Sequence, residues 1–90
     1  MSREIYLNAE KITNQKSMAK YMKKTFAFPD YFGGNLDALY DCLSEVDEET
    51  DVILDQNAVA AVCDNDYAYS VLMVMSRAAE DNPYLRILFR

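Results

Sequence analysis

The sequence has 90 residues, of which 51% are apolar and 27% are charged, and its formal net charge is −6. This length and composition predict one folded domain over residues 1–90 and exclude a disordered chain. The 15 acidic residues against nine basic ones argue against nucleic acid as a direct partner, because affinity for a phosphate backbone comes mainly from clustered Lys and Arg, and favour a basic protein partner.

Histidine is absent, and the two cysteines, Cys42 and Cys63, have no spacing typical of a zinc site or a disulfide scaffold. Without His, mechanisms of the Ser-His-Asp and Cys-His kinds are excluded. The first residues carry charges where a signal peptide has its apolar stretch, and no apolar run approaches the ~20 residues of a membrane helix. We therefore expect a cytoplasmic protein with reduced thiols and no membrane contact.

The first part of the chain predicts a strand followed by a helix. Residues 4–8 contain a short apolar run, Ile-Tyr-Leu, which is typical of a strand buried on both faces. Asn14 can cap a helix that ends near Phe26, because apolar residues then recur at helical spacing. The opposite face of this helix carries four lysines without interleaved aromatic residues, and we interpret it as a solvated face. These lysines are Lys16, Lys20, Lys23 and Lys24.

Residues 28–46, FPDYFGGNLDALYDCLSEV, are the most informative stretch of the sequence. Its Phe-Pro-Asp start ends the first helix, since proline disfavours helical geometry in the preceding residue and has no N–H to donate. Gly33 and Gly34 are the only glycines, and adjacent glycines are typical of a backbone that needs φ > 0 or is closely approached. Asn35 can cap a second helix that runs to about Val46.

The second half of the chain predicts two more strands and two more helices. Residues 51–55 have the β-branched core of a buried strand, and residues 57–62 form a short helix. A long helix over 66–81 is apolar on most sides and should be largely buried, and a strand over 85–89 follows. Strands separated by helices indicate parallel pairing, because a parallel connection needs a long crossover. We therefore predict an α/β domain with a three-stranded parallel sheet and four helices; the pattern leaves the strand order open.

The second helix separates apolar from acidic residues. At about 100° per residue its leucines share one arc, while Asp37, Asp41 and Glu45 form a line well away from it. The plainer interpretation is the solvent face of an amphipathic helix. No Lys or Arg stands three or four positions from Asp37 or Asp41, however, so like-charge repulsion of ~0.2–0.5 kcal/mol per pair stays uncompensated. Tyr31 and Tyr40 adjoin this line, which favours a surface for contact with a partner.

An enzyme is a third hypothesis, in which Asp37 and Asp41 bind Mg²⁺ or act as an acid/base pair. Two carboxylates without a neighbouring His, Ser or Lys make a weak catalytic site, and the further oxygen ligands that a metal needs are not evident. We therefore expect no enzyme activity, no metal and no cofactor.

The stretch from Pro29 to Leu43, PDYFGGNLDALYDCL, resembles the barstar family, which are intracellular protein inhibitors of secreted ribonucleases of the barnase type. The predicted order of elements is similar to that family along essentially the whole chain. The resemblance implies a barstar-like fold in which the loop and the second helix plug the active site of a basic extracellular ribonuclease. We expect the free protein to be a monomer.

The resemblance also implies roles for matching positions. Asp41 would present its carboxylate where the enzyme binds a substrate phosphate, and Asp37 would pair with a basic group on the rim. Tyr31 would pack against the active-site surface, while Gly33 and Asn35 would let the loop come close and hold the helix start. The full predicted contact set is Tyr31, Phe32, Gly33, Gly34, Asn35, Asp37, Ala38, Tyr40, Asp41, Ser44, Glu45 and Arg77.

Three positions depart from the family pattern. Gly34 stands where the family often has a charged residue, so we expect a more mobile loop. Tyr40 stands where the family often has Trp, so its anchor area is smaller. Arg77 stands where the family commonly has an acidic residue that contacts the enzyme. Glu80 and Asp81 could take the place of that acidic residue. Arg77 motivates the alternative hypothesis of a barstar-fold immunity or binding module for another basic protein or toxin.

Overall fold

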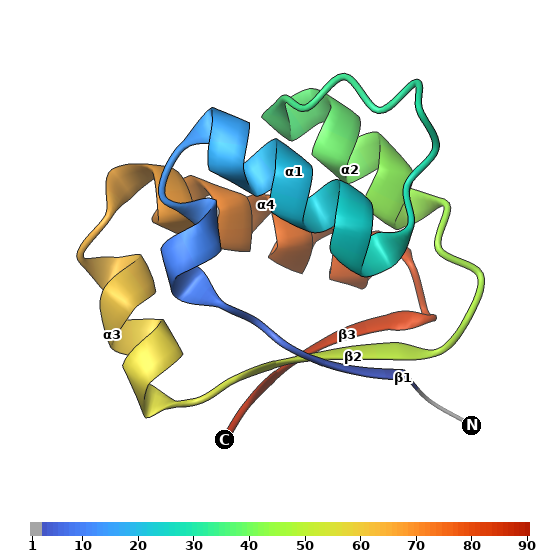
Figure 1. Ribbon diagram of the computed structural model, residues 1–90. Coiled ribbons are helices and arrows are strands. Elements are labelled where there is room, and N and C mark those ends of the chain that lie inside the picture. Colours follow the sequence, from blue (N-terminus) through green and yellow to red (C-terminus); the bar gives the residue numbers. More distant parts are fainter. Residues whose placement is uncertain (1–2) are drawn as a thin grey trace.

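Helices cover one face of a three-stranded sheet in the computed structural model, which describes residues 3–90 (Figure 1). The strands are β1 (Arg3–Tyr6), β2 (Thr50–Leu54) and β3 (Leu85–Phe89). The helices are α1 (Gln15–Phe26), α2 (Leu36–Ser44), α3 (Gln56–Cys63) and α4 (Asp66–Asp81). A short 3₁₀ helix, η1 (Ala9–Ile12), follows β1 and was not predicted from the sequence.

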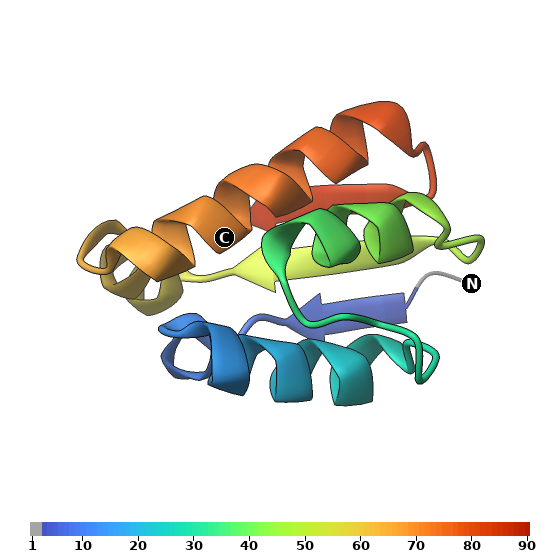
Figure 2. The same cartoon turned by 90° about the horizontal axis from the view of Figure 1, so that it is seen from above.

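The sheet is entirely parallel, and its strand order is β1-β2-β3. This architecture confirms the predicted α/β fold. Seen from above, α1, α2 and α4 lie side by side over the sheet, and α2 runs between the other two (Figure 2). Helix α2, which contains most of the predicted contact residues, therefore lies in the middle of the helical layer.

The prediction that the first strand is buried on both faces is wrong. β1 ends at Tyr6, and Tyr6 is 64% exposed, whereas its neighbour Ile5 is buried. The helices cover only one face of the sheet, and β1 is an edge strand, so side chains on its other face remain open to solvent (Figure 1). The central strand β2 has neighbours on both sides, and all five of its residues are buried.

Side-chain caps explain where the helices begin. Asn14 and Asn35 accept the backbone N–H of the third residue of α1 and α2, as predicted, and Asp55 and Asn65 do the same for α3 and α4. The other boundaries differ slightly from the prediction, since α2 ends at Ser44 and α3 includes one more residue at each end.

One core lies between the helices and the covered face of the sheet. Met18, Met22 and Phe26 bury one stripe of α1, as predicted. The long helix α4 is less buried than predicted: its inner side is buried, but Tyr69 is 52% and Met73 is 44% exposed. Helix α4 lies at the side of the helical layer, with α2 on one flank only (Figure 2). Its apolar residues therefore include some that face solvent.

On the uncovered face of the sheet, Asp51 of β2 is 5% exposed and forms a two-pronged ion pair with Arg86 of β3. Its carboxylate oxygens accept from Nε at 2.8 Å and from Nη2 at 2.9 Å. These bonds hold the pKa of Asp51 below its ordinary value of 3.8. Folding therefore favours the ionised form of Asp51. The contribution of the ion pair to stability is present above pH 3.8 and is lost as the pH falls through the lowered pKa of Asp51.

Asp51→Asn is accordingly expected to lower the free energy of unfolding at neutral pH, because it removes the charged partner of Arg86. The difference from the unmodified protein should shrink as the pH falls below 3.8, where Asp51 of the unfolded chain takes up its proton, and should vanish below the lowered pKa of the folded protein. Urea unfolding at a series of pH values measures both curves. A difference that stays constant down to acid pH would contradict the assigned role of the charge.

Candidate protein-contact surface

The loop between α1 and α2 is anchored by aromatic side chains that pack against one another. Phe28 is buried, and its ring lies 5.3 Å from that of Phe26 and 5.0 Å from that of Phe32. Phe32 therefore belongs mainly to the core, although it was predicted to contact a partner. Its neighbour Tyr31 is 73% exposed and is the aromatic residue of this loop that is free to meet another molecule.

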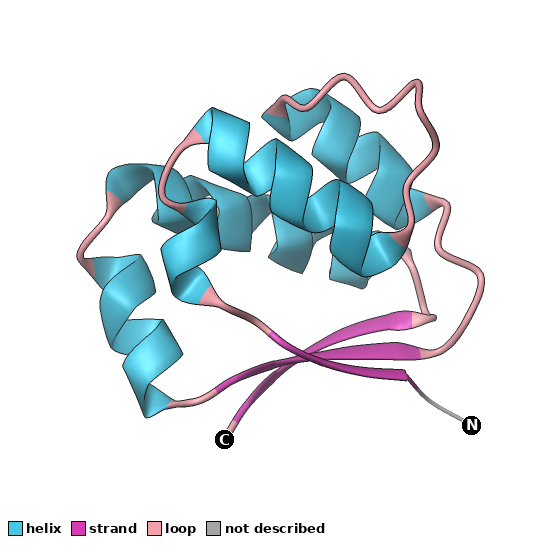
Figure 3. Cartoon of the chain, in the orientation of Figure 1, coloured by secondary structure: helices cyan, strands magenta, loops and turns pink. Residues whose placement is uncertain are grey.

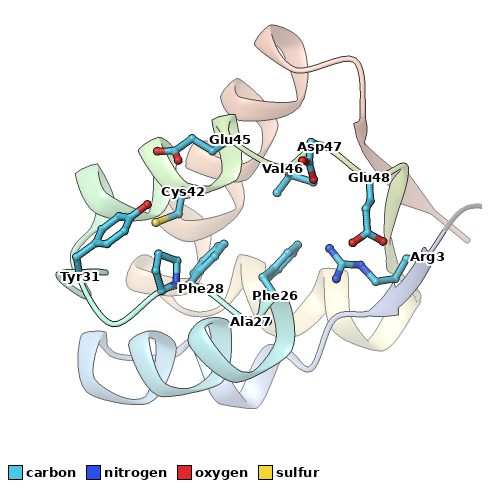
Figure 4. A pocket seen from close by; sticks show the side chains of 11 residues that line it. Arg3, Phe26, Ala27, Phe28, Tyr31, Cys42, Glu45, Val46, Asp47 and Glu48 are labelled. Atoms are coloured by element: carbon cyan, nitrogen blue, oxygen red, sulfur yellow. The ribbon is translucent and has the colours of Figure 1, made fainter.

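The same loop turns back along α2 before that helix begins (Figure 3). Asn35 then starts α2, because its Oδ1 accepts the Ala38 N–H at 2.7 Å. As a result, Tyr31 does not lie beside the first turn of α2 but lines a hollow together with Cys42 and Glu45 (Figure 4). The sequence places Tyr31 close to Asp37 along the chain, whereas the fold moves it to the other end of the helix.

The two glycines of the loop differ. Gly34 has φ +77° and is buried, and a Cβ atom built on it would stand 3.0 Å from the Cβ of Ala19 in α1. Gly33 is exposed, and a Cβ there would meet only Ala38 at an ordinary 3.8 Å. The predicted need for φ > 0 is thus confirmed at Gly34, where the loop passes closely over α1.

Gly34→Ala is expected to lower the free energy of unfolding by ~1–2 kcal/mol, because an L-residue at positive φ is strained and its methyl group would lie tightly against Ala19. Gly33→Ala is the matched control and should change the free energy of unfolding by less than about 0.5 kcal/mol. Chemical denaturation of the two variants measures the difference. Equal effects would show that the backbone of the loop relaxes around either substitution.

Helix α2 presents its acids to solvent and its apolar residues to the core, as its periodicity predicts. Asp37, Asp41 and Glu45 are exposed, whereas Leu39 and Leu43 are completely buried. From Asp37 to Glu49 every charged residue is acidic, and within residues 3–90 none of these acids forms an ion pair. The negative charge of this surface is therefore available to a partner.

A hollow between α2 and α4 brings together several predicted contact residues. It is lined by Leu36, Asp37, Tyr40, Asp41, Val74, Arg77, Glu80 and Asp81. We refer to it as the α2–α4 hollow. Four carboxylates and one guanidinium share this hollow, so its local charge is negative at neutral pH. The sequence did not indicate that Leu36 and Val74 line this hollow, because the helical periodicity assigns both residues to the core.

Tyr40 connects the two walls of the α2–α4 hollow. Its hydroxyl donates a hydrogen bond to the Asp81 carboxylate, which raises the pKa of Tyr40 above its ordinary value. Asp81 is thereby engaged within the protein and is less available as a substitute for the family acid than Glu80. Ser44, another predicted contact residue, donates to the Tyr40 carbonyl oxygen at 2.8 Å, which leaves its hydroxyl bound to its own helix.

A second hollow, which we call the loop hollow, lies on the other flank of α2 (Figure 4). It is lined by Arg3, Phe26, Ala27, Phe28, Pro29, Tyr31, Cys42, Glu45, Val46, Asp47 and Glu48. Aromatic side chains form its floor, and acidic side chains stand on its rim. Asp47 and Glu48 were not predicted as contact residues, although the Asp-Glu-Glu run over residues 47–49, shortly after α2, is a sequence signal that indicates them.

Residues 3–90 contain neither a candidate metal cluster nor a disulfide. Within residues 3–90 no group of three or more Cys, Asp and Glu side chains is placed to hold a metal ion. Cys42 and Cys63 are both free, and burial together with the nearby carboxylates of Glu45 and Asp41 raises the pKa of the Cys42 thiol. A thiol with a raised pKa is a poor nucleophile at neutral pH. In the described part of the chain, no helix combines the length and the apolar character required to cross a lipid bilayer.

The similarity of this chain to known proteins extends over nearly its whole length. Residues 2–89 match the family described as barstar (barnase inhibitor), which confirms the resemblance seen in the sequence. A protein of Bacillus subtilis (strain 168) named "Putative ribonuclease inhibitor YrdF" is 34% identical over 80 residues, covering 88% of each chain. Proteins of this family are inhibitors and not enzymes, in agreement with the expected lack of catalytic activity. The chain belongs to the barstar family.

Proposed function

We propose that this protein is an intracellular inhibitor of a secreted ribonuclease of the barnase type. It would cover the active site of the enzyme with the loop and the acidic helix over residues 30–45. The observation that carries the proposal is the exposed, unpaired acidic face of α2, on which Asp37 and Asp41 lie without a neighbouring cation on the helix. An enzyme that cleaves RNA presents cationic groups to the phosphates of its substrate, and this face is complementary to them.

Asp41 is assigned the role of the phosphate mimic. Its carboxylate would lie against the Arg and Lys side chains that bind the substrate phosphate, where charge-assisted hydrogen bonds are strong. Asp37, one turn earlier, would pair with a basic group on the rim. Tyr31 is the exposed aromatic anchor, and exposed Gly33 lets the enzyme surface approach the backbone of the loop.

The loop hollow extends the proposed contact beyond the acidic face. Its rim acids, Glu45, Asp47 and Glu48, are exposed, and Tyr31 stands at its edge. We assign them to attraction of the enzyme over distance, because exposed charges change the association rate more than the dissociation rate. Asp41 would then supply most of the affinity, and the rim acids most of the salt dependence.

Arg77 favours a second candidate function, namely a barstar-fold immunity or binding module for another basic protein or toxin. Arg77 is exposed within the α2–α4 hollow and forms no ion pair among residues 3–90. A uniformly cationic enzyme cleft would be repelled by this guanidinium. A partner that fits must therefore present an acidic or neutral group opposite Arg77 and cationic groups opposite Asp37 and Asp41.

The proposal is tested by adding the purified protein to a ribonuclease of the barnase type and following cleavage of a fluorescent RNA. We expect inhibition at one-to-one stoichiometry that weakens as salt is added, because screening reduces the attraction between the charged surfaces. A basic ribonuclease of unrelated fold is the control and should not be inhibited. Lack of inhibition of the barnase-type enzyme, combined with tight binding to a different basic toxin, would replace the first function by the second.

A further inference from the structure

A side chain from the end of α4 closes the C-terminal end of α2. Helix ends leave carbonyl groups without partners inside the helix, and no glycine follows α2 to close it with a left-handed turn. The backbone N–H of Val46 donates to the Leu43 carbonyl oxygen at 3.3 Å. The side-chain nitrogen Nδ2 of Asn82 adds hydrogen bonds to the carbonyl oxygens of Leu43, at 3.0 Å, and Val46, at 2.9 Å. A longer contact of 3.5 Å reaches the Ser44 carbonyl. One amide group thus binds the backbone inside and just beyond the end of α2.

Asn82 is itself held in place by the turn that leads into β3. It is 5% exposed, and its Oδ1 accepts the N–H of Tyr84 at 2.9 Å. Pro83 follows and restricts Asn82 to extended backbone geometry, in agreement with its φ of −125° and ψ of 108°. An Asn side chain has donor hydrogens and an acceptor oxygen, so it can serve α2 and the turn at once. A carboxylate of the same shape has no hydrogen to donate to α2.

The residue before Asn82 also binds α2. Asp81 accepts the hydrogen bond from Tyr40, so two consecutive residues attach α4 to the middle and to the end of α2. Asp41 lies in the sequence between these two points of attachment. The orientation of the acidic face is therefore set by α4, which is packed along α2 in the helical layer (Figure 2).

We propose that Asn82 is a positioning residue for the ribonuclease contact and acts through α2 without touching the enzyme. This inference rests on the proposed function, since it requires that Asp41 meets the partner. Burial keeps Asn82 away from any partner surface, and its hydrogen bonds keep the end of α2 in a single arrangement. Without them, binding must also order the end of the helix, and the complex dissociates faster.

The test compares Asn82→Asp with Val62→Ala, under conditions in which both variants are folded. Asn82→Asp keeps the shape of the side chain and removes the hydrogen bonds donated to α2. Val62 is 1% exposed on α3, so Val62→Ala lowers stability by loss of core packing away from the contact surface. Association and dissociation rates with the ribonuclease are measured by surface plasmon resonance.

We expect Asn82→Asp to dissociate about tenfold faster or more, because the hydrogen bonds that Asn82 donates to α2 are lost. The association rate should change little, and Val62→Ala should keep both wild-type rates. Combining Asn82→Asp with Asp41→Ala should give less than the sum of the two single effects, since Asn82 acts through the placement of Asp41. Dissociation of Asn82→Asp as slow as that of Val62→Ala would overturn the proposal.

Amide hydrogen exchange of the free protein separates this inference from the proposed function. Asn82→Asp should raise exchange at the end of α2, over residues 41–46, and leave α3 unchanged. Unaltered exchange over this segment would overturn the positioning role, whatever the ribonuclease does. If exchange rises as expected but the wild-type protein does not bind the ribonuclease, then the attachment of α2 stands and the ribonuclease contact is refuted.

Discussion

Asp41→Ala is expected to weaken binding to a barnase-type ribonuclease by ~2–5 kcal/mol, which is roughly thirtyfold to several thousandfold in the dissociation constant. Asp41 is exposed, lines the α2–α4 hollow, and has no ion-pair partner among residues 3–90. Its carboxylate is therefore free to be enclosed by the cationic groups that bind a substrate phosphate. Removing it would leave those groups buried in the complex without their counter-charge. Isothermal titration calorimetry measures the change.

Glu45→Ala is the matched comparison for Asp41→Ala, because both positions are exposed acids on α2. Glu45 lines the loop hollow with Tyr31, away from Asp37, so its substitution should weaken binding by less than about 1 kcal/mol. Asp41→Asn keeps the size of the side chain and removes its charge, and it should resemble Asp41→Ala. Small and equal effects at Asp41 and Glu45 would rule out the proposed orientation of α2 on the enzyme.

Leu43→Ala is expected to lower the free energy of unfolding by ~2–5 kcal/mol, which is a large part of the ~5–15 kcal/mol typical of a small domain. Leu43 is completely buried on the inner side of α2, in the core shared with α4 and the sheet. Its truncation removes apolar contacts and leaves a cavity that packed neighbours cannot fill. Urea denaturation followed by circular dichroism measures the loss.

Leu72→Ala serves as the control for this prediction. Leu72 is only partly buried on α4, so the same change in side chain should cost clearly less stability. Under conditions in which it is folded, Leu43→Ala should still inhibit the ribonuclease, because Leu43 does not face the partner. A variant with near wild-type stability would show that α2 is held mainly by its hydrogen bonds to α4.

Local chemistry made much of this fold predictable. The caps at Asn14 and Asn35 and the buried stripe of α1 depend on residues a few positions apart, and all of them appear as expected. Parallel pairing followed from the alternation of strands and helices. The strand order did not follow, because it depends on how the crossovers pack. For the same reason the sequence did not reveal that one face of the sheet lies open and leaves Tyr6 exposed.

The sequence located the candidate site along the chain but did not reveal which distant residues contact it. Spacing separated Asp37 and Asp41 from the leucines of α2, and the fold agrees with that separation. The contact of Tyr40 with Asp81 joins residues 41 positions apart, which no local pattern encodes. The return of the loop along α2, which carries Tyr31 to the side of Glu45, is likewise a result of tertiary packing.

The order of the strands makes the sheet depend on contacts between distant parts of the chain. The central strand is bonded on one side through Arg3 and Thr50, 47 positions apart, and on the other through Asp51 and Arg86, 35 positions apart. Contacts between such distant segments form late, because the chain between them must first be ordered. β3 is the last of these segments to leave the ribosome. The three-stranded sheet is therefore complete only after β3 has been synthesised and has paired with β2.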